Sequence, residues 1–256
     1  MIEIRPIHPH EAEPFLRLLC EVFDLDFGRA RSVFFTEPLF DLQRKWALVE
    51  DGHLVSVLTT VPLLFGWGGA IGIAGVATRP SSQGRGYATQ LLDYVLEEAC
   101  GRGEKGALLF ARDARVYRRS GFEEIDEVLR GPIDGSPEKH SAILSSAEVR
   151  RLYDDWAQGH SARLRRDDKR WDYWKWTLRV CSAIPDGYLC LEGGLLRECV
   201  AARPPGDWPV GRGVEWLGLR NVATQLGLPL LQPRLDLYLM GRGIPEPPQM
   251  FMTDQF

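Results

Sequence analysis

Two glycines that follow a short apolar run carry the clearest chemical signal in the sequence. The run Ile71–Thr78 consists of small and apolar residues and is followed by Pro80, a pattern typical of a buried strand that ends there. The stretch QGRGYA at residues 83–88 then leads into a helical pattern. Glycine at positions 84 and 86 permits backbone conformations that a side chain forbids, so several amide N–H groups can converge at a helix N-terminus. We expect this loop to bind a diphosphate or a similar anion.

The spacing of the loop narrows the choice of ligand. A dinucleotide-binding fold would place GxGxxG near the first strand with an acidic residue about 20 positions later, and a P-loop would place Lys-Ser or Lys-Thr after its last glycine. Neither pattern fits this loop. A glycine-rich connection between strand and helix that binds nothing is the alternative interpretation, because short glycine motifs also recur by chance.

Two ordered motifs carry a resemblance to a known family. The arrangement Gln/Arg-x-x-Gly-x-Gly/Ala after a strand-ending x-Pro resembles the pyrophosphate loop of the GCN5-related N-acetyltransferases (GNAT), with Gln83, Gly86 and Ala88 at its defining positions. The segment Tyr117–Phe122 is similar to the family's second signature, Tyr-x-x-x-Gly-Phe. The resemblance covers residues 1–133. It implies the GNAT acyl-CoA N-acyltransferase fold, an α/β (α+β) fold with a mixed sheet, and acetyl-CoA as the acyl donor.

The resemblance also implies which groups hold acetyl-CoA. The main chain of residues 76–78 would hold the pantetheine arm and polarise the thioester carbonyl, and residues 83–89 would hold the pyrophosphate. Asp113, a predicted helix cap after the next strand, is assigned to the same site. No metal is expected. The expected cofactor-binding residues are Val76, Ala77, Thr78, Gln83, Gly84, Arg85, Gly86, Tyr87, Ala88, Thr89 and Asp113.

Tyr117 is the expected general acid. Acetyl transfer to an amine needs a deprotonated amine, a polarised thioester carbonyl and a proton for the departing thiolate. By resemblance Tyr117 would supply that proton, because a phenol with a pKa of about 10 can share it with a thiol whose pKa is about 8.5. A tyrosine of the buried core is the alternative interpretation of this residue.

The base departs from the commonest family pattern. Many GNAT enzymes carry a carboxylate on the strand before the cofactor loop, but residues 70–78 contain neither an acid nor a histidine. The enhanced intracellular survival (Eis) acetyltransferases also lack that acid, and they end in an aromatic residue whose terminal carboxylate reaches the active site. The ending FMTDQF at residues 251–256 looks similar, so Phe256 is the expected base. Eis proteins are much longer and carry a third, sterol-carrier-like region. The alternative role of Phe256 is an aromatic plug that pins the terminus.

The elements that must position these groups follow from hydrophobic periodicity. Apolar residues at helical spacing predict an amphipathic helix over Glu11–Phe23 and another directly after the glycine loop. A short helix over Val116–Phe122 would end at Gly121. Strands are expected at Ile2–Arg5, Trp46–Val49, Leu54–Phe65, Ile71–Thr78, Ala107–Ala111 and Ile125–Ile133. This is the order of an α/β fold with a crossover at the cofactor loop.

A turn-rich stretch at residues 131–137 marks the predicted domain boundary. The GNAT domain would occupy residues 1–135, and a smaller α+β domain at residues 141–256 would wall the acceptor pocket. A degenerate second GNAT-like unit is an open alternative for this domain. Its expected elements are a helix capped by Ser145 and Glu148, a helix marked by Trp171, Trp174 and Leu178, strands at Gly187–Leu191, Arg197–Ala202, Val214–Leu217 and Leu235–Met240, and a helix at Leu219–Leu226.

Two unusual stretches follow each other in the second domain. The sequence WDYWKW at residues 171–176 is interpreted mainly as core, with a stacking platform for sugars or bases as the alternative. The stretch Arg163–Arg170 is interleaved with Asp167 and Asp168 and is interpreted as the solvated start of a helix, in preference to a binding patch.

Composition argues against several other classes of protein. The chain has 256 residues, 45% of them hydrophobic, and a formal net charge of −4, which gives no general attraction for nucleic acid or anionic lipid. No apolar run approaches the ~20 residues that span a bilayer, and the N-terminus lacks the pattern of a signal peptide. The five cysteines form no CxxC pair. We expect a cytoplasmic protein whose partners are neither nucleic acid nor membrane.

The sequence therefore predicts an acetyl-CoA-dependent N-acetyltransferase that passes an acetyl group to a primary amine by direct attack in a ternary complex. The acceptor would be a small-molecule or peptide amine, and a polyamine of the aminoglycoside type follows from the Eis analogy alone. The competing hypothesis is a CoA-binding regulatory or scaffold protein that has kept the fold and lost catalysis. The missing strand acid is its main support. The sequence does not set the oligomeric state.

Overall fold

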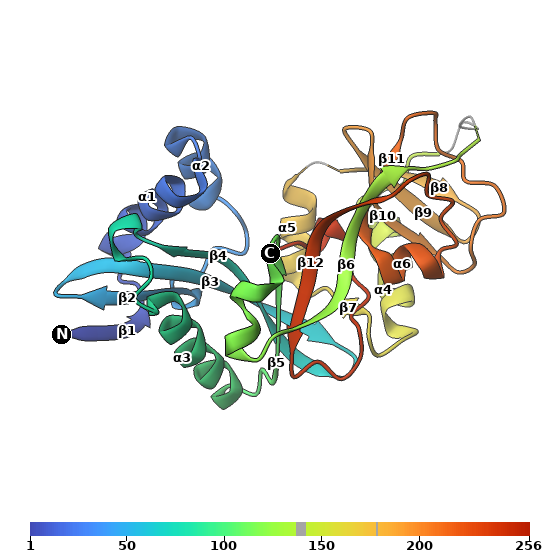
Figure 1. Ribbon diagram of the computed structural model, residues 1–256. Coiled ribbons are helices and arrows are strands. Elements are labelled where there is room, and N and C mark those ends of the chain that lie inside the picture. Colours follow the sequence, from blue (N-terminus) through green and yellow to red (C-terminus); the bar gives the residue numbers. More distant parts are fainter. Residues whose placement is uncertain (137–141, 178) are drawn as a thin grey trace.

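The computed structural model describes residues 1–136, 142–177 and 179–256. Residues 137–141 of the predicted linker region, and Leu178 of the predicted helix, lie outside the described residues. Figure 1 shows an elongated molecule in which one sheet connects two parts of the chain.

The first part follows the predicted order of elements. Its strands are β1 (Ile2–Pro6), β2 (Lys45–Glu50), β3 (His53–Phe65), β4 (Gly68–Thr78), β5 (Gly106–Ala111) and β6 (Glu123–Pro132), and its helices are α1 (Ala12–Phe23), α2 (Phe27–Phe34) and α3 (Tyr87–Gly101). Helix α2 was not expected from the sequence. It is eight residues long, and the Asp26 carboxylate caps it by accepting the Arg29 N–H.

One short element of the first part differs from the prediction. The helix expected over Val116–Phe122 is replaced by two 3-10 turns, Ala114–Val116 and Arg118–Ser120. Gly121, with a φ of 78°, ends the segment in the left-handed conformation before a full α-helix can form.

The second part contains the predicted helices and strands together with two strands that were not predicted. Its elements are α4 (Ser146–Gln158), β7 (Leu164–Arg165), α5 (Asp168–Trp176), β8 (Val180–Ile184), β9 (Gly187–Glu192), β10 (Leu195–Ala201), β11 (Glu215–Leu219), α6 (Arg220–Gln225) and β12 (Arg234–Arg242). Strands β7 and β8 are the additions. The capping box of Ser145 and Glu148 at the start of α4 is confirmed. Among the residues that the structure describes, none of the helices combines the length and apolar character that a membrane crossing requires.

A mixed sheet runs through both parts, in the order β1-β2-β3-β4-β5-β12-β6-β11-β10-β9-β8, with β7 paired to β3. Strand β12, late in the chain, lies between β5 and β6 and is antiparallel to both. The sheet of the first part is therefore completed by a strand from the end of the second. The division of the chain between residues 135 and 141 stays a prediction, and β12 adds that the two parts share one continuous sheet.

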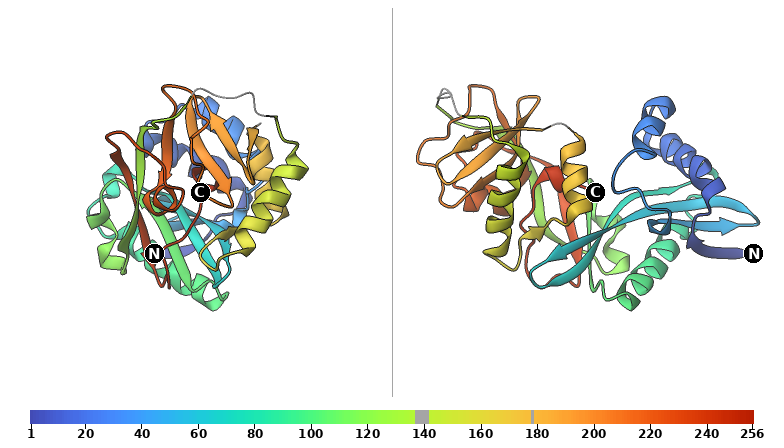
Figure 2. Two further views of the ribbon diagram at one scale, coloured as in Figure 1. Left: turned by 90° about the vertical axis from the view of Figure 1, so that its right-hand side faces the viewer. Right: turned by 180° about the vertical axis from the view of Figure 1, so that it is seen from behind.

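Three hydrophobic clusters hold the layers together. Helix α3 packs on one face of the first part through Leu91 and Val95, and α1 and α2 pack on the other face through Phe15 and Phe34. The third cluster spans both parts of the chain. It contains Trp171, Trp174, Trp216 and Phe251 of the second part together with Phe65 and Leu108 of the first. The right-hand view of Figure 2 shows α1 and α3 on opposite sides of the sheet and the C-terminus between the two parts of the chain. The interpretation of Trp171 and Trp174 as core residues is confirmed.

Candidate active site

Strands β4 and β5 separate near the middle of the sheet. They pair in parallel only where Ala70–Ile73 faces Gly106–Leu109, although β4 continues to Thr78 and β5 to Ala111. Within the described residues, the β5 side of residues 76–78 therefore has no strand partner. Main-chain N–H and C=O groups at such an edge can bond an extended ligand in place of a strand.

A bulge turns β4 at the same place. The register with β3 shifts between the Val57–Ala77 and Thr59–Ala74 pairs, and Gly75 within the shift has a φ of 59°. A side chain at Gly75 would be strained by this backbone conformation, and its Cβ would lie 3.2 Å from Leu19 of helix α1. Glycine therefore lets the strand bend toward its separation from β5.

The glycine loop leads into the N-terminus of α3 as predicted. Gly84 and Gly86 have φ values of 78° and 80°, and no atom of the described residues lies within 4 Å of a Cβ built at either position. Gly86 is the N-cap of α3, and no side chain in the described ranges caps this helix end. The amides of its first turn, which includes Ala88 and Thr89, are thus left to bind an anion that the helix dipole also favours.

Side chains of the loop and strand hold each other in place. The Gln83 amide donates from Nε2 to the Thr78 carbonyl at 3.1 Å, which ties the loop to the end of β4. The Tyr87 hydroxyl is 2.6 Å from Oε1 of Glu50, and Arg85 lies 3.9 Å from the same carboxylate. Tyr87 thus anchors the start of α3 on strand β2.

The other predicted cofactor residues differ in their surroundings. Val76 lines the cavity described below, whereas Ala77 is buried in the cluster beneath α1. The Thr78 hydroxyl is 2.9 Å from that of Ser56. The Asp113 carboxylate accepts the Arg115 N–H at 3.0 Å and pairs with the Arg115 guanidinium, which lowers its pKa to about 2. Its observed contacts are those of a helix cap, as expected, and its contact with a cofactor stays a prediction.

Tyr117 and Phe256, 139 positions apart in the sequence, line the same cavity of about 220 Å³, which we call the reaction cavity. Its remaining walls come from α1, β4, β5, β12 and residues 251–256, which we call the tail. The residues are Phe23, Ile73, Ala74, Gly75, Val76, Leu109, Phe110, Leu237 and Gln255. Burial raises the pKa of Tyr117, whose ring packs edge-on to Phe122. In the part of the chain that the structure describes, its hydroxyl makes no hydrogen bond.

The Phe256 ring lies directly on strand β4. A Cβ at Gly72 would overlap the Phe256 ring, so only glycine permits this contact. The ring also packs against Phe110 of β5, with 5.4 Å between the ring centroids. The tail therefore ends where β4 and β5 begin to separate.

A buried ion cluster holds the tail, and sequence reasoning missed it. The Arg166 guanidinium bonds the Glu198 carboxylate at 2.7 and 3.1 Å and the Asp254 carboxylate at 2.7 and 2.8 Å. It also lies 3.7 Å from the Tyr153 ring centroid and 4.8 Å from that of Trp171. Burial alone would lower the pKa of Arg166, but the two carboxylates raise it well above its usual range.

Arg170 connects the same tail to the first part of the chain. This side chain donates to the Asp254 carbonyl at 3.3 Å and to the Pro62 carbonyl of β3 at 2.9 Å. The interpretation of Arg163–Arg170 as solvated was wrong for Arg166 and Arg170, which are 6% and 3% exposed. The alternation of Arg with Asp indicated a solvated helix start, whereas Arg166 pairs with residues 32 and 88 positions away. The only local signal was the adjacent cluster of tryptophans.

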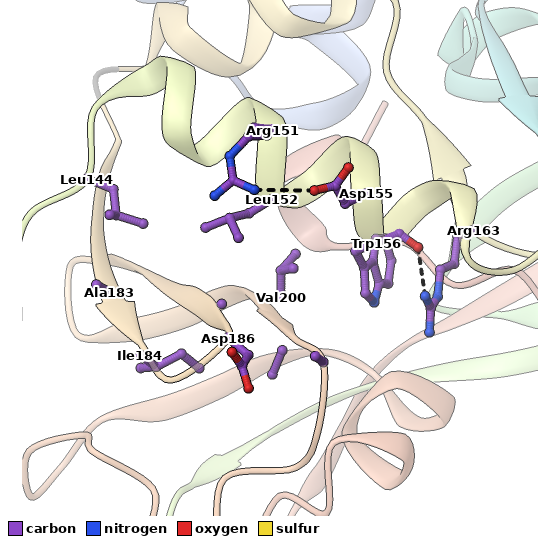
Figure 3. A pocket seen from close by; sticks show the side chains of 13 residues that line it. Leu144, Arg151, Leu152, Asp155, Trp156, Arg163, Ala183, Ile184, Asp186 and Val200 are labelled. Atoms are coloured by element: carbon purple, nitrogen blue, oxygen red, sulfur yellow. Dashed lines mark hydrogen bonds and ion pairs between the residues drawn. The ribbon is translucent and has the colours of Figure 1, made fainter.

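Another cavity, of about 650 Å³, lies between α4 and strands β8–β10, away from the predicted site residues (Figure 3). Arg163 stacks on Trp156 with 4.6 Å to its ring centroid, and it bonds the Trp156 carbonyl and the Gln249 side chain. Trp156 in turn packs against Phe251 at 5.0 Å between ring centroids. This wall of the cavity therefore supports the start of the tail.

Comparison with known proteins agrees with this geometry. Residues 3–125 match the model of the acetyltransferase (GNAT) domain. No curated protein sequence matches the chain. Residues 3–125 therefore form a GNAT acetyltransferase domain, which confirms the resemblance carried by the glycine loop and by Tyr117–Phe122.

Several solved structures share the fold over nearly the whole chain. A GCN5-related N-acetyltransferase from Kribbella flavida has a TM-score of 0.74 and 19% identity, covering 94% of this chain and 70% of its own. Eis1 from Mycobacterium abscessus has a TM-score of 0.65 and 16% identity, and the match covers 93% of this chain and 73% of Eis1. A putative acetyltransferase from Pyrococcus horikoshii has a TM-score of 0.68 and 12% identity, and the match covers 99% of this chain and 92% of the Pyrococcus chain. The second part of the chain thus belongs to an arrangement found in other proteins with this fold.

Proposed function

We propose that this protein is an acetyl-CoA-dependent N-acetyltransferase that acetylates a primary amine by direct attack in a ternary complex. One observation carries the proposal. An uncapped helix N-terminus, a free strand edge and a cavity shared by Tyr117 and Phe256 converge where β4 separates from β5. The GNAT domain at residues 3–125 supports the same activity.

The residues present fit acetyl-CoA as the acyl donor. The open space at Gly84 and Gly86 admits a pyrophosphate to the first-turn amides of α3. The free edge of β4 at residues 76–78 can bond the amide groups of a pantetheine arm. When bound, acetyl-CoA supplies the acetyl group as an activated thioester.

Tyr117 and Phe256 are proposed to move the protons. The amine nitrogen forms a bond to the acetyl carbon, the carbon–sulfur bond breaks, and the thiolate takes the proton of the Tyr117 hydroxyl. The pKa of this phenol is raised by burial, so the group is protonated at neutral pH. The α-carboxylate of Phe256 is proposed to take the proton that the amine loses, directly or through a water molecule. Exchange with solvent then restores both groups.

The experiment that tests the activity combines two measurements on the purified protein. Calorimetric titration measures acetyl-CoA binding, and a thiol reagent measures release of CoA in the presence of a panel of primary amines. We expect binding and amine-dependent release. Absence of binding would contradict the cofactor site itself.

A CoA-binding scaffold is the second candidate, and the absence of an acid or histidine in residues 70–78 favours it. Binding without release for every amine would support the scaffold and contradict the transferase. The shared cavity of Tyr117 and Phe256 favours the transferase, because a site that only binds CoA has no need of a proton donor beside the strand separation.

A further inference from the structure

We infer that the acceptor of this enzyme is a compact primary amine with an apolar body and no second positive charge. The inference rests on the proposed function and names the substrate class of the same site. Its basis is a cavity of about 190 Å³ beside Phe256, which we call the acceptor cavity.

The acceptor cavity and the reaction cavity lie against the same residues. Ala74, Gly75, Gln255 and Phe256 line both, whereas Tyr117 and Val76 line only the reaction cavity. An acceptor in the first cavity therefore meets a thioester in the second beside the bulge of β4. The remaining walls of the acceptor cavity come from both parts of the chain, through Leu19, Phe34, Glu37, Leu39, Lys45, Thr59, Val61 and Tyr173.

Size and lining favour a small apolar body. Cavities that hold drug-sized ligands measure roughly 300–1,000 Å³, so a cavity of about 190 Å³ suits a much smaller molecule. The rings of Phe34, Tyr173 and Phe256 form its aromatic walls. Such rings bind alkyl and aryl groups, and their faces also attract one ammonium group.

The charged side chains of the cavity argue against a polycation. Glu37 and Lys45 are the charged residues among its lining side chains in the described part of the chain, and they pair at 3.4 Å. Lys45 is 4% exposed, and its ammonium lies 5.0 Å from the Phe34 ring centroid and 5.5 Å from that of Phe40. Burial lowers the pKa of Lys45, an effect that the Glu37 carboxylate opposes.

The pair therefore gives the cavity no net side-chain charge, and the α-carboxylate of Phe256, which also lines it, is assigned to the amine that reacts. The Glu37 carboxylate is engaged with Lys45, so it is not free to neutralise a second ammonium on the acceptor. A second ammonium would also lie near the enclosed cation of Lys45, and like charges in a desolvated site repel strongly. Tyr173 adds no charge at neutral pH, because burial raises its pKa.

Pentylamine and cadaverine form a matched pair of acceptors for the test. They have the same five-carbon chain, and cadaverine carries a second amine. We expect kcat/KM for pentylamine to exceed that for cadaverine by about tenfold or more, since tenfold corresponds to about 1.4 kcal/mol. Phenethylamine should behave like pentylamine, and spermidine and kanamycin like cadaverine.

Two variants test the cause of this preference. Lys45→Met keeps most of the side-chain volume and removes the cation, so the preference for pentylamine should fall by about tenfold as Glu37 becomes free. Lys105→Met, at an exposed lysine that lines neither cavity, is the matched control and should keep the wild-type preference. Glu37→Gln leaves Lys45 unpaired and should increase the preference. Because Glu37→Gln changes the preference in the opposite direction, it serves even where Lys45→Met does not fold.

The outcomes separate the inference from the proposed function. Equal or better turnover of cadaverine, spermidine or kanamycin would overturn the inference alone, and so would an unchanged preference in folded Lys45→Met or Glu37→Gln. Binding of acetyl-CoA without turnover of any of these amines would overturn the proposed transferase and the inference with it.

Discussion

Tyr117 places a single hydroxyl group beside the strand separation, and its role can be tested by removing that group alone. Tyr117→Phe keeps the ring that packs against Phe122 and removes the proton donor. We expect kcat to fall by about 10²–10⁴ with little change in acetyl-CoA affinity. Steady-state kinetics and calorimetric titration of both proteins check this. A near-normal kcat would return Tyr117 to the role of a core residue.

The pH dependence of the wild type gives a second view of the same phenol. The acid acts only while protonated, and burial raises its pKa above the ordinary value of 10. Loss of the acid would therefore occur only as the pH rises through that elevated pKa. The component of kcat that the Tyr117→Phe substitution removes should not decrease as the pH is raised to about 10. A loss of this component near neutral pH would contradict the assignment.

Phe256 combines an aromatic ring on Gly72 with an α-carboxylate, and two C-terminal variants separate the two. Appending one glycine keeps the ring and moves the charge by one residue, whereas deleting Phe256 removes both. If the carboxylate is the base, both variants should lose about 10²–10⁴ in kcat while they keep their affinity for acetyl-CoA. Full activity of the extended protein together with an inactive deletion would leave the ring as the important part.

At the scale of elements, the loop between β4 and α3 is the part that a nucleotide must approach most closely. Gly86→Val places a side chain beside the first-turn amides of α3, so acetyl-CoA affinity should fall by about tenfold or more. Gly213→Val is a matched control, because Gly213 also has a positive φ of 88° and open space around its Cβ but lies in the second part of the chain. Both variants should lose stability by about 1–2 kcal/mol from backbone strain.

Thermal unfolding and calorimetric titration of the two glycine variants provide the comparison. Equal acetyl-CoA affinity in folded Gly86→Val and Gly213→Val would remove the cofactor from this loop. A loss in both would point to a general effect of strain on the fold.

Most elements could be predicted because their signals are local. The helix α1, the hairpin β2–β3 and the glycine loop each follow from periodicity or turn residues within one segment of the sequence. The position of β12 between β5 and β6 could not be predicted in this way, because its pattern resembles any short strand. Tertiary pairing alone decides which strands become its neighbours.

The residues of the site could likewise be predicted only where they belong to a local motif. Gln83, Gly86 and Tyr117 belong to local motifs, so their sequence neighbours reveal them. Arg166 contacts carboxylates that are distant in the sequence, and a charge pattern carries no information about such partners. Glu37 and Lys45 likewise lack a motif, and only packing places them beside Phe256.

At the scale of the whole molecule, the tail joins the two parts, and Arg170 is its link to β3. Arg170→Met breaks the bonds to the buried Asp254 carbonyl and to the Pro62 carbonyl, whose bond is only partly buried. The buried carbonyl left without its donor should cost about 1–3 kcal/mol in the free energy of unfolding. Loosening the tail should also lower kcat while the acetyl-CoA affinity, which depends on the α3 loop, stays unchanged.

Arg165→Met, at the exposed arginine of β7, is the control for this change. Denaturant unfolding and steady-state kinetics should distinguish the two variants. A folded Arg170→Met protein with wild-type kcat would show that the tail needs no link to β3.

Direct transfer of an acetyl group from acetyl-CoA to an amine is proposed to occur where β4 separates from β5. Initial velocities measured while acetyl-CoA and pentylamine are varied together, with mass spectrometry of the products, test this transfer. We expect intersecting double-reciprocal lines, one acetylated pentylamine for each CoA released, and no acetylated protein intermediate. Parallel lines with an acetyl group on the protein, or CoA released without acetylated amine, would contradict it.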